Sequence, residues 1–304
     1  MTEPHLYRII QHRRILYVLS GVFMLASVVF IALGGLKLGI DFTGGSRLVV
    51  QFHGIERPPA REVVAALETL QLGEVIGQPL GDQSYALRMR TVTDAERSSA
   101  VSALQERYPG LTEDSFETVG PVVGQQLQQR SLAAILLVLL AIVTYISIAF
   151  RKSTSGVIRP WTYGVGAVIA LIHDVIVVMG FFALLGLING VEVGTLFVTA
   201  LLTILGFSVH DTIVVYDRLR ENLRYRAHPT FETAVNVSVN ETLVRSLNTS
   251  LTTIFVLLAL YLFGGSTIQD FVLALIVGII TGTYSSIFIA SPLLVTWHAW
   301  RQNR

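Results

Sequence analysis

The feature that most constrains this chain is a series of apolar windows, each about as long as a bilayer-crossing helix. A membrane-spanning helix needs about 20 consecutive, mostly apolar residues. Six windows reach about that length, at residues 15–36, 131–150, 160–187, 194–217, 242–263 and 270–297. Charged residues make up only 14% of the chain, against about a quarter in soluble domains. The sequence therefore predicts an α-helical polytopic membrane protein with six transmembrane helices.

The first and fifth windows need separate arguments. Arg8, Arg13 and Arg14 precede the first window, as positive charges do in a secretory signal peptide. Its apolar part is longer than the roughly 7–15 residues of a signal h-region, so we expect a retained helix. The fifth window is strongly apolar only over residues 251–263, and it reaches spanning length only when the polar residues before them are included. That extension places Arg245 inside the bilayer.

Positive charge is unevenly distributed among the short loops. Lysines and arginines follow the second, fourth and sixth windows, whereas loops 188–193 and 264–269 contain none. The residues concerned are Arg151, Lys152, Arg159, Arg218, Arg220, Arg224, Arg226, Arg301 and Arg304. Because positively charged short loops stay on the cytoplasmic side, we expect both termini, residues 1–14 and 301–304, to be cytoplasmic.

Residues 37–129, between the first two windows, are polar and are expected to fold outside the cytoplasm. Their pattern follows the order βαββαβ, which is typical of a small α+β ferredoxin-like domain. Thr93 and Glu96 have the spacing of a capping box at the start of the second helix. No catalytic cluster stands out, so we expect no enzyme activity. The expected strands are 47–52, 74–80, 84–90 and 113–120, and the expected helices are 58–71 and 93–108.

Composition argues against several function classes. The net charge is +1, so no basic field suggests nucleic acid. The chain has no cysteine, which removes disulfides and thiolate metal sites. It also has no GxSxG motif and no phosphate-binding glycine loop. We expect neither a metal nor a cofactor.

Small residues recur at helical spacing where helices should pack. Gly166 and Ala170 are followed at the same spacing by Asp174, and Gly278 and Gly282 are followed in the same way by a serine. Stripes of small residues let the backbones of membrane helices approach closely. These stripes predict close helix packing around Asp174 and along the sixth helix.

Charged side chains inside the predicted helices give the strongest functional indication. A charge at the bilayer centre costs about 2.5–3.5 kcal/mol on insertion scales, so it normally faces a protein interior and has a partner. Asp211 lies six residues before Asp217, which places it roughly 9 Å inside the cytoplasmic boundary. Arg245 has a similar expected depth on the next helix, with Thr249 and Thr252 on its face. The two charges can therefore pair across neighbouring helices.

Three interpretations of this pair are open. It can be a structural ion pair, or a proton relay in which the aspartate changes protonation while the arginine stays charged. One charge moved through 100 mV is worth about 2.3 kcal/mol, and one pH unit adds about 1.4 kcal/mol. The third interpretation is transport of a divalent cation, which His173–Asp174 and His210–Asp211 would bind. Adjacent residues on a helix point about 100° apart, so each such pair offers one inward ligand, which disfavours the metal.

Four segments together resemble the SecD/SecF family of protein-export membrane proteins, on its SecF side. They are “GIDFTGGSRLVVQF” (39–52), “LIHD” (171–174), “GFSVHDTIVVYDRLREN” (206–222) and “NETLVRSLNTS” (240–250). The resemblance covers essentially the whole chain, in order and with matching spacing. It implies a build similar to half of an RND-type transporter, located in the bacterial cytoplasmic (inner) membrane. With six spans, the chain is expected to be the SecF half alone.

The resemblance also implies partners and a mechanism. SecD would supply another six helices and a larger exported domain, and the pair would associate with the SecYEG channel and with YajC. Together they would use the proton-motive force to pull or release unfolded preproteins on the outer side, after the SecA motor has acted. Two alternatives remain: a passive scaffold for the channel complex, and an RND-like exporter of small molecules. For the exporter, the exported domain is too small, and it is single, to form a drug-binding pocket.

Residue roles follow from the resemblance as well. The proton-linked positions of the family correspond to Asp211 in “HDT” and Arg245 in “ETLVRS”, with Asp174 in “LIHD” a weaker candidate. The partner acids of Arg245 in the family include one from SecD. Family members often have Asn where this chain has His210. A histidine there titrates near neutrality and could tune the relay, or it packs as a neutral side chain.

A last motif lies just after the first window. Asp41, Phe42, Gly44 and Gly45 match the family's D-F-x-G-G segment, which opens the exported domain at the membrane exit. Since glycine tolerates positive φ freely, the two glycines are expected to serve backbone geometry there.

Overall fold

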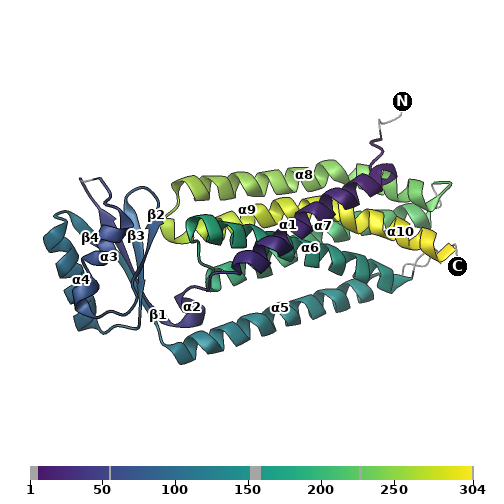
Figure 1. The fold of residues 1–304 in the computed structure, drawn as a ribbon. Helices are drawn as coiled ribbons and strands as arrows, with labels where there is room; N and C mark the ends of the chain where they lie inside the picture. Colours follow the sequence, from purple (N-terminus) through teal and green to yellow (C-terminus); the bar gives the residue numbers. More distant parts are fainter. Residues whose placement is uncertain (1–5, 55, 151–158, 226–227, 303–304) are drawn as a thin grey trace. The chain divides into compact units, whose positions relative to one another are not determined.

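A computed structural model describes residues 6–54, 56–150, 159–225 and 228–302. The chain divides into two units. One comprises residues 1–35, 134–184 and 197–304, and is helical (Figure 1). The other comprises residues 36–133 and 185–196, and contains the four-stranded sheet. Arg151, Lys152, Arg226 and Arg304, four of the charges on which the expected orientation rests, lie outside the described residues.

Six helices in the described part of the chain are long and apolar enough to cross a membrane, which confirms the predicted fold class. The first five are α1 (Arg13–Gly34), α5 (Pro121–Ala149), α6 (Pro160–Asn189), α7 (Thr195–Arg224) and α8 (Phe231–Phe263). The sixth consists of α9 (Gln269–Ser285), a π-helical turn η4 (Ser286–Ala290) and α10 (Ser291–Gln302). Short 3-10 turns η1 (Ile10–His12) and η3 (Ser266–Ile268) precede the first and sixth helices.

Two helices begin well before the apolar windows that predicted them. Helix α5 begins at Pro121 rather than near residue 131, and α8 begins at Phe231 rather than near residue 242. The Thr230 side chain accepts a hydrogen bond from the Thr233 amide and so caps the start of α8. Hydropathy detects only the apolar part of a helix, whereas polar residues with good helical propensity extend both of these helices beyond it.

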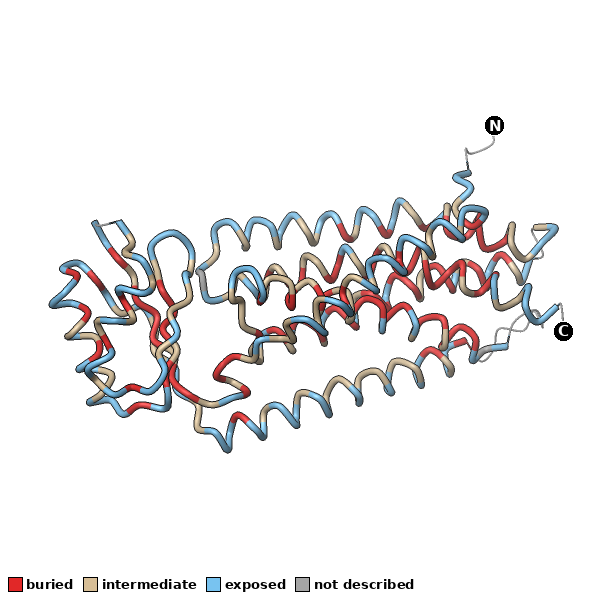
Figure 2. The backbone as a smooth tube through the Cα atoms, in the orientation of Figure 1, coloured by how far each residue is buried: buried red, intermediate tan, exposed pale blue. Residues whose placement is uncertain are grey.

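Glycines allow close packing within the helical unit. A Cβ atom on Gly282 of α9 would lie 2.8 Å from the Cβ of Ser208 on α7, and one on Gly166 of α6 would lie 2.7 Å from the hydroxyl of Tyr216. A Cβ on Gly278 would overlap the side chain of Ile204. The small-residue stripes therefore pack helices closely, as predicted. Figure 2 shows the result: α7 and α9 are extensively buried, whereas α5 and α8 are largely exposed.

The strand-containing unit has the predicted ferredoxin-like topology. Its strands are β1 (Gly45–Phe52), β2 (Ile76–Leu80), β3 (Ser84–Met89) and β4 (Leu111–Val119), in the sheet order β2-β3-β1-β4. Every neighbouring pair is antiparallel, so β1 and β2 run in the same direction with β3 between them. This is the split βαβ arrangement. A short helix α2 (Ile40–Thr43) precedes β1.

Two helical segments connect the strands. The first crossover is shorter than expected, because α3 (Ala60–Ala65) ends early and continues as a 3-10 turn, η2 (Glu68–Leu70). The second is α4 (Asp94–Arg107), which begins with the predicted capping box of Thr93 and Glu96. Hydrogen bonds from Arg90 and from Thr93 lower the pKa of the Glu96 carboxyl to about 2. The carboxylate that completes the cap is therefore ionised at neutral pH.

Candidate functional site

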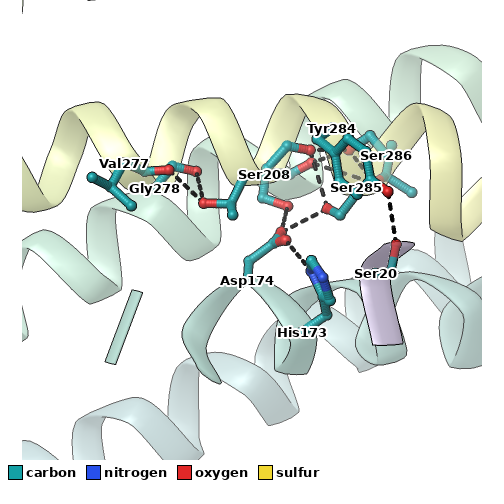
Figure 3. Close-up of polar contacts among 12 residues, drawn as sticks. Ser20, His173, Asp174, Ser208, Val277, Gly278, Tyr284, Ser285 and Ser286 are labelled. Carbon is teal, nitrogen blue, oxygen red and sulfur yellow. Dashed lines mark hydrogen bonds and ion pairs between the residues drawn. The ribbon is translucent and has the colours of Figure 1, made fainter. Parts of the chain in front are cut away.

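A buried carboxylate lies where three helices of the helical unit meet. Asp174 of α6 is fully buried, and its Oδ2 accepts hydrogen bonds from Ser208 Oγ at 2.6 Å and Ser285 Oγ at 2.8 Å. Its Oδ1 lies 3.1 Å from Nδ1 of His173, which is also buried. Figure 3 shows Asp174 between Ser208 on α7 and Ser285 on α9. The carboxylate therefore ties α6 to both of these helices.

The close approach of α7 and α9 makes this geometry possible. Serine has a short side chain, so its hydroxyl reaches a third helix only when the backbones lie near each other. Gly282 permits that approach against Ser208, one turn before Ser285 contacts Asp174. The small-residue stripe of α9 and the buried acid of α6 thus belong to one arrangement.

Asp211 forms the second buried carboxylate of the bundle. It lies on α7, three residues after Ser208, and is 1% exposed. Its Oδ2 accepts from Thr283 Oγ1 of α9 at 3.3 Å, and Thr283 Oγ1 lies 2.5 Å from Ser250 Oγ of α8. Ser246 of α8 is buried as well, and its hydroxyl has no hydrogen-bond partner among the described residues. A polar seam of hydroxyl groups and carboxylates therefore joins α6, α7, α8 and α9.

Asp211 and Arg245 do not form a direct ion pair in the structure. No ion pair joins them among the described residues, and Arg245 is exposed. The reason is helical geometry: Ser246 takes the inward position on α8, and adjacent residues on a helix point about 100° apart. The basic group beside Asp211 is instead His210, whose Nδ1 lies 3.8 Å from Asp211 Oδ1. The His210 side chain is 65% exposed, so it is not packed inside the bundle of this chain.

A few polar residues lie among the exposed positions of α7 and α8 inside the apolar windows. On α7 the exposed positions include Thr203, Gly206 and His210, at spacings of three and four residues. On α8 they include Arg245 and Thr252. The C-terminal part of α7 and the N-terminal part of α8 are linked by the Arg218–Glu241 ion pair, at 2.7 Å, among other contacts. The polar residues of α7 and α8 therefore lie partly in the buried seam and partly on the exposed surface of the bundle.

The motif that follows α1 has a structural role of its own. Asp41 Oδ2 accepts hydrogen bonds from the backbone N–H of Thr195, at 2.6 Å, and from the Thr195 hydroxyl, at 2.8 Å. Thr195 is the first residue of α7, so Asp41 caps the helix that carries Asp211. Gly44 and Gly45 both have positive φ, and a Cβ on Gly45 would lie 2.7 Å from the carbonyl oxygen of Met89. Phe42 is buried beside them.

Asp41→Ala is expected to loosen the first turn of α7. Loss of a helix cap costs about 1 kcal/mol, which corresponds to roughly fivefold faster amide exchange if that turn opens locally. Hydrogen exchange read by mass spectrometry over residues 195–200 measures this. Asp41→Asn keeps an oxygen acceptor and is expected to exchange more slowly than Asp41→Ala. Equal exchange in all three proteins would show that the cap contributes nothing.

Sequence reasoning missed most of the hydrogen-bond donors in the seam. Ser208, Thr283 and Ser285 contact the two carboxylates directly, yet none was singled out. A usable signal existed, because hydroxyl residues at three- and four-residue spacing in an apolar helix predict a buried polar face. Groups of three or more His, Asp or Glu side chains that could hold a metal are absent from the part of the chain that the structure describes.

Together these features define a class: a polytopic membrane protein with a βαββαβ domain between its first two spans and acids buried in its helical bundle. Residues 100–300 match the family described as protein export membrane protein SecD/SecF, C-terminal, and residues 29–54 match the SecD/SecF GG motif. The chain belongs to the SecD/SecF family.

Named relatives and solved structures agree with this assignment. The protein translocase subunit SecF of Thermobaculum terrenum is 47% identical over 95% of this chain and 93% of its own length. The protein translocase subunit SecF of Anaerolinea thermophila is 39% identical over 96% of this chain and 95% of its own length. The crystal structure of SecDF, a translocon-associated membrane protein from Thermus thermophilus, matches 99% of this chain with a TM-score of 0.86 and 32% identity. This chain covers only 39% of that SecDF chain.

Proposed function

We propose that this chain works with SecD as a subunit of the bacterial protein translocase and uses the proton-motive force to promote preprotein movement. The names of its relatives, protein translocase subunit SecF, support the translocase role. The SecDF structure, in which one longer chain includes a region similar to this one, supports SecD as the partner. The proposed activity is energy coupling without a covalent reaction.

One observation carries the proposal: a buried acid, Asp211, lies beside exposed basic residues on α7 and α8. Arg245 and His210 are exposed within apolar windows. Contact of a charged side chain with lipid is costly, so another polypeptide must cover these residues. Six helices of SecD are a suitable cover, and an acid from SecD would give Arg245 the partner that it lacks within the described residues.

The seam suggests how a proton would act. Asp211 would gain a proton from one side of the membrane and lose it to the other, while Arg245 stays charged throughout. Protonation removes the negative charge to which Thr283 donates, and so weakens one link between α7 and α9. One proton driven by 100 mV and one pH unit supplies roughly 3.7 kcal/mol. That energy is enough to shift a two-state membrane protein between conformations.

The remaining assignments belong to the same proposal. The cytoplasmic membrane is the proposed location, with both termini in the cytoplasm and the ferredoxin-like unit outside. SecYEG, YajC, SecA indirectly, and unfolded preproteins are the proposed further partners. A passive scaffold that only stabilises the channel complex is the second candidate, since the seam also connects four helices.

Reconstitution distinguishes coupling from scaffolding. Inverted membrane vesicles depleted of their own SecD and SecF would receive SecD with or without this chain, and preprotein translocation would be measured with and without an uncoupler. Coupling predicts a several-fold stimulation by the chain that the uncoupler abolishes. A scaffold predicts the same stimulation in both conditions, and that result would overturn the proposal.

A further inference from the structure

The pair His173 and Asp174 is a deeply buried acid–base pair in the bundle, and the proposed relay through Asp211 does not use it. Asp174 is 0% exposed and His173 is 4% exposed. The pair has its own donors, Ser208 and Ser285, whereas Asp211 receives its hydrogen bond from Thr283. It therefore forms a separate site within the same seam.

The charge of this site depends on its own protons. No lysine or arginine in the described part of the chain forms an ion pair with Asp174. The groups that face the pair are Ser208 from α7, Ser285 and Tyr284 from α9, and Ser20 of α1 through its hydrogen bond to Tyr284. Of these only the tyrosine carries an ionisable side chain.

A bare carboxylate beside a neutral imidazole would leave the site with a charge of −1 in the middle of a membrane protein. One additional proton makes the site neutral, either as imidazolium with carboxylate or as imidazole with carboxylic acid. Net charge in such surroundings is costly, whereas the two serine hydroxyls stabilise the carboxylate form. Opposing effects of this kind let a site both take up and release one proton.

The geometry also identifies the atom at which the proton binds. Nδ1 of His173 faces the Asp174 carboxylate, so in the deprotonated site Nδ1 carries the hydrogen and donates it. Nε2 is buried and has no hydrogen-bond partner among the described residues. Its lone pair is therefore free to accept a proton. Binding forms the Nε2–H bond and an imidazolium whose positive charge the carboxylate balances, and release breaks the same bond.

Proton binding at this site would alter helix packing. Protonation at Nε2 leaves Asp174 charged but turns the Nδ1–H at its Oδ1 into a positively charged donor, which draws the carboxylate charge toward His173 and weakens the two bonds that Oδ2 accepts from α7 and α9. Ser285 is also the last residue before the π-helical turn Ser286–Ala290. Such turns mark places where a helix departs from regular geometry, frequently at functional sites.

We propose that His173 and Asp174 form a second proton-binding site, distinct from Asp211, which takes up its proton at Nε2 of His173 and thereby adjusts the contact of α6 with α7 and α9. Its use in energy coupling rests on the proposed function, whereas proton binding itself does not. The two ideas can therefore fail separately.

Solid-state NMR of the complex with SecD in lipid nanodiscs, with ¹⁵N-labelled histidine rings, tests this directly and needs no translocation. The His173 signals are those that disappear in His173→Gln, and His12→Gln serves as the control for assignment. Over a titration from about pH 5 to about pH 9, the His173 ring is expected to change from imidazolium to the Nδ1–H neutral form. Asp174→Asn removes the balancing charge. The midpoint of the His173 titration is therefore expected to move toward acid, to a proton concentration at least tenfold higher than in the wild type.

Ser285→Ala keeps the carboxylate and serves as a milder second variant if Asp174→Asn does not assemble. It removes one stabilising donor, so the midpoint is expected to move toward alkali. A His173 ring that stays neutral over the whole range would overturn the proposal. So would a midpoint that is the same in the wild type and in whichever of the two variants assembles.

Discussion

Asp211→Asn is expected to abolish the stimulation of translocation by the proton-motive force while leaving the complex with SecD assembled. In energised inverted vesicles, the translocation rate of the variant should fall to the rate that the wild type shows with an uncoupler. The loss is expected to be several-fold, the whole of the stimulated component.

The physical reason is that asparagine keeps the shape of the site but cannot titrate. Its side-chain oxygen can still accept the hydrogen bond from Thr283, and the residue remains buried between α7 and α9. What disappears is the change of charge, and with it the roughly 3.7 kcal/mol that one proton can deliver for 100 mV and one pH unit. Packing and coupling are thereby separated.

A matched control lies on the same helix. Asp217 is exposed and forms an ion pair with Arg220 at 2.7 Å, so Asp217→Asn makes the same chemical change outside the seam. Exposed ion pairs contribute about 0–1 kcal/mol, and this variant should translocate like the wild type. If Asp211→Asn retained its response to the uncoupler, or if the complex were lost instead, the scaffold would be the better description.

The fold was largely predictable because its strongest constraints are local. Window length determines which segments can span a bilayer, and the alternation of strands and helices gave the βαββαβ order. Thr93 and Glu96 gave the correct start of α4 for the same reason, since a capping box involves four consecutive residues. Helices α5 and α8 begin before the predicted spans because polar turns extend them beyond their apolar windows.

The site was predictable only in part, because the sequence of one helix does not determine which residues of other helices it contacts. Asp211 and Asp174 stood out since an acid in an apolar run is costly wherever it points. Which residue pairs with them depends on helix rotation, which spacing alone does not determine. Arg245 was accordingly given a partner on the basis of depth, whereas the structure gives the inward position to Ser246. The cap that Asp41 forms on Thr195 joins residues 154 positions apart, beyond any local pattern.

The second large effect is expected from Gly282→Val, which should destabilise the helical unit by about 3 kcal/mol or more. A Cβ at this position would lie 2.8 Å from Ser208 Cβ and 3.2 Å from Ser208 Cα. A side chain can rotate away from such a contact, but a backbone atom cannot, so α7 and α9 must separate. Overpacking of this kind costs typically 1–3 kcal/mol, occasionally more.

Separation of these helices also disrupts the seam, which is why the upper part of that range applies. Ser208 and Ser285 reach Asp174 only because α7 and α9 are close, and loss of a donor leaves a buried carboxylate undersatisfied at a cost of about 1–3 kcal/mol. Thermal unfolding of the purified complex in detergent measures the combined effect. Gly21→Val is the matched control, since Gly21 lies in α1 with no atom within 4 Å of its added Cβ. Equal stability of the two variants would mean that the close approach of α7 to α9 is not needed to hold Asp174.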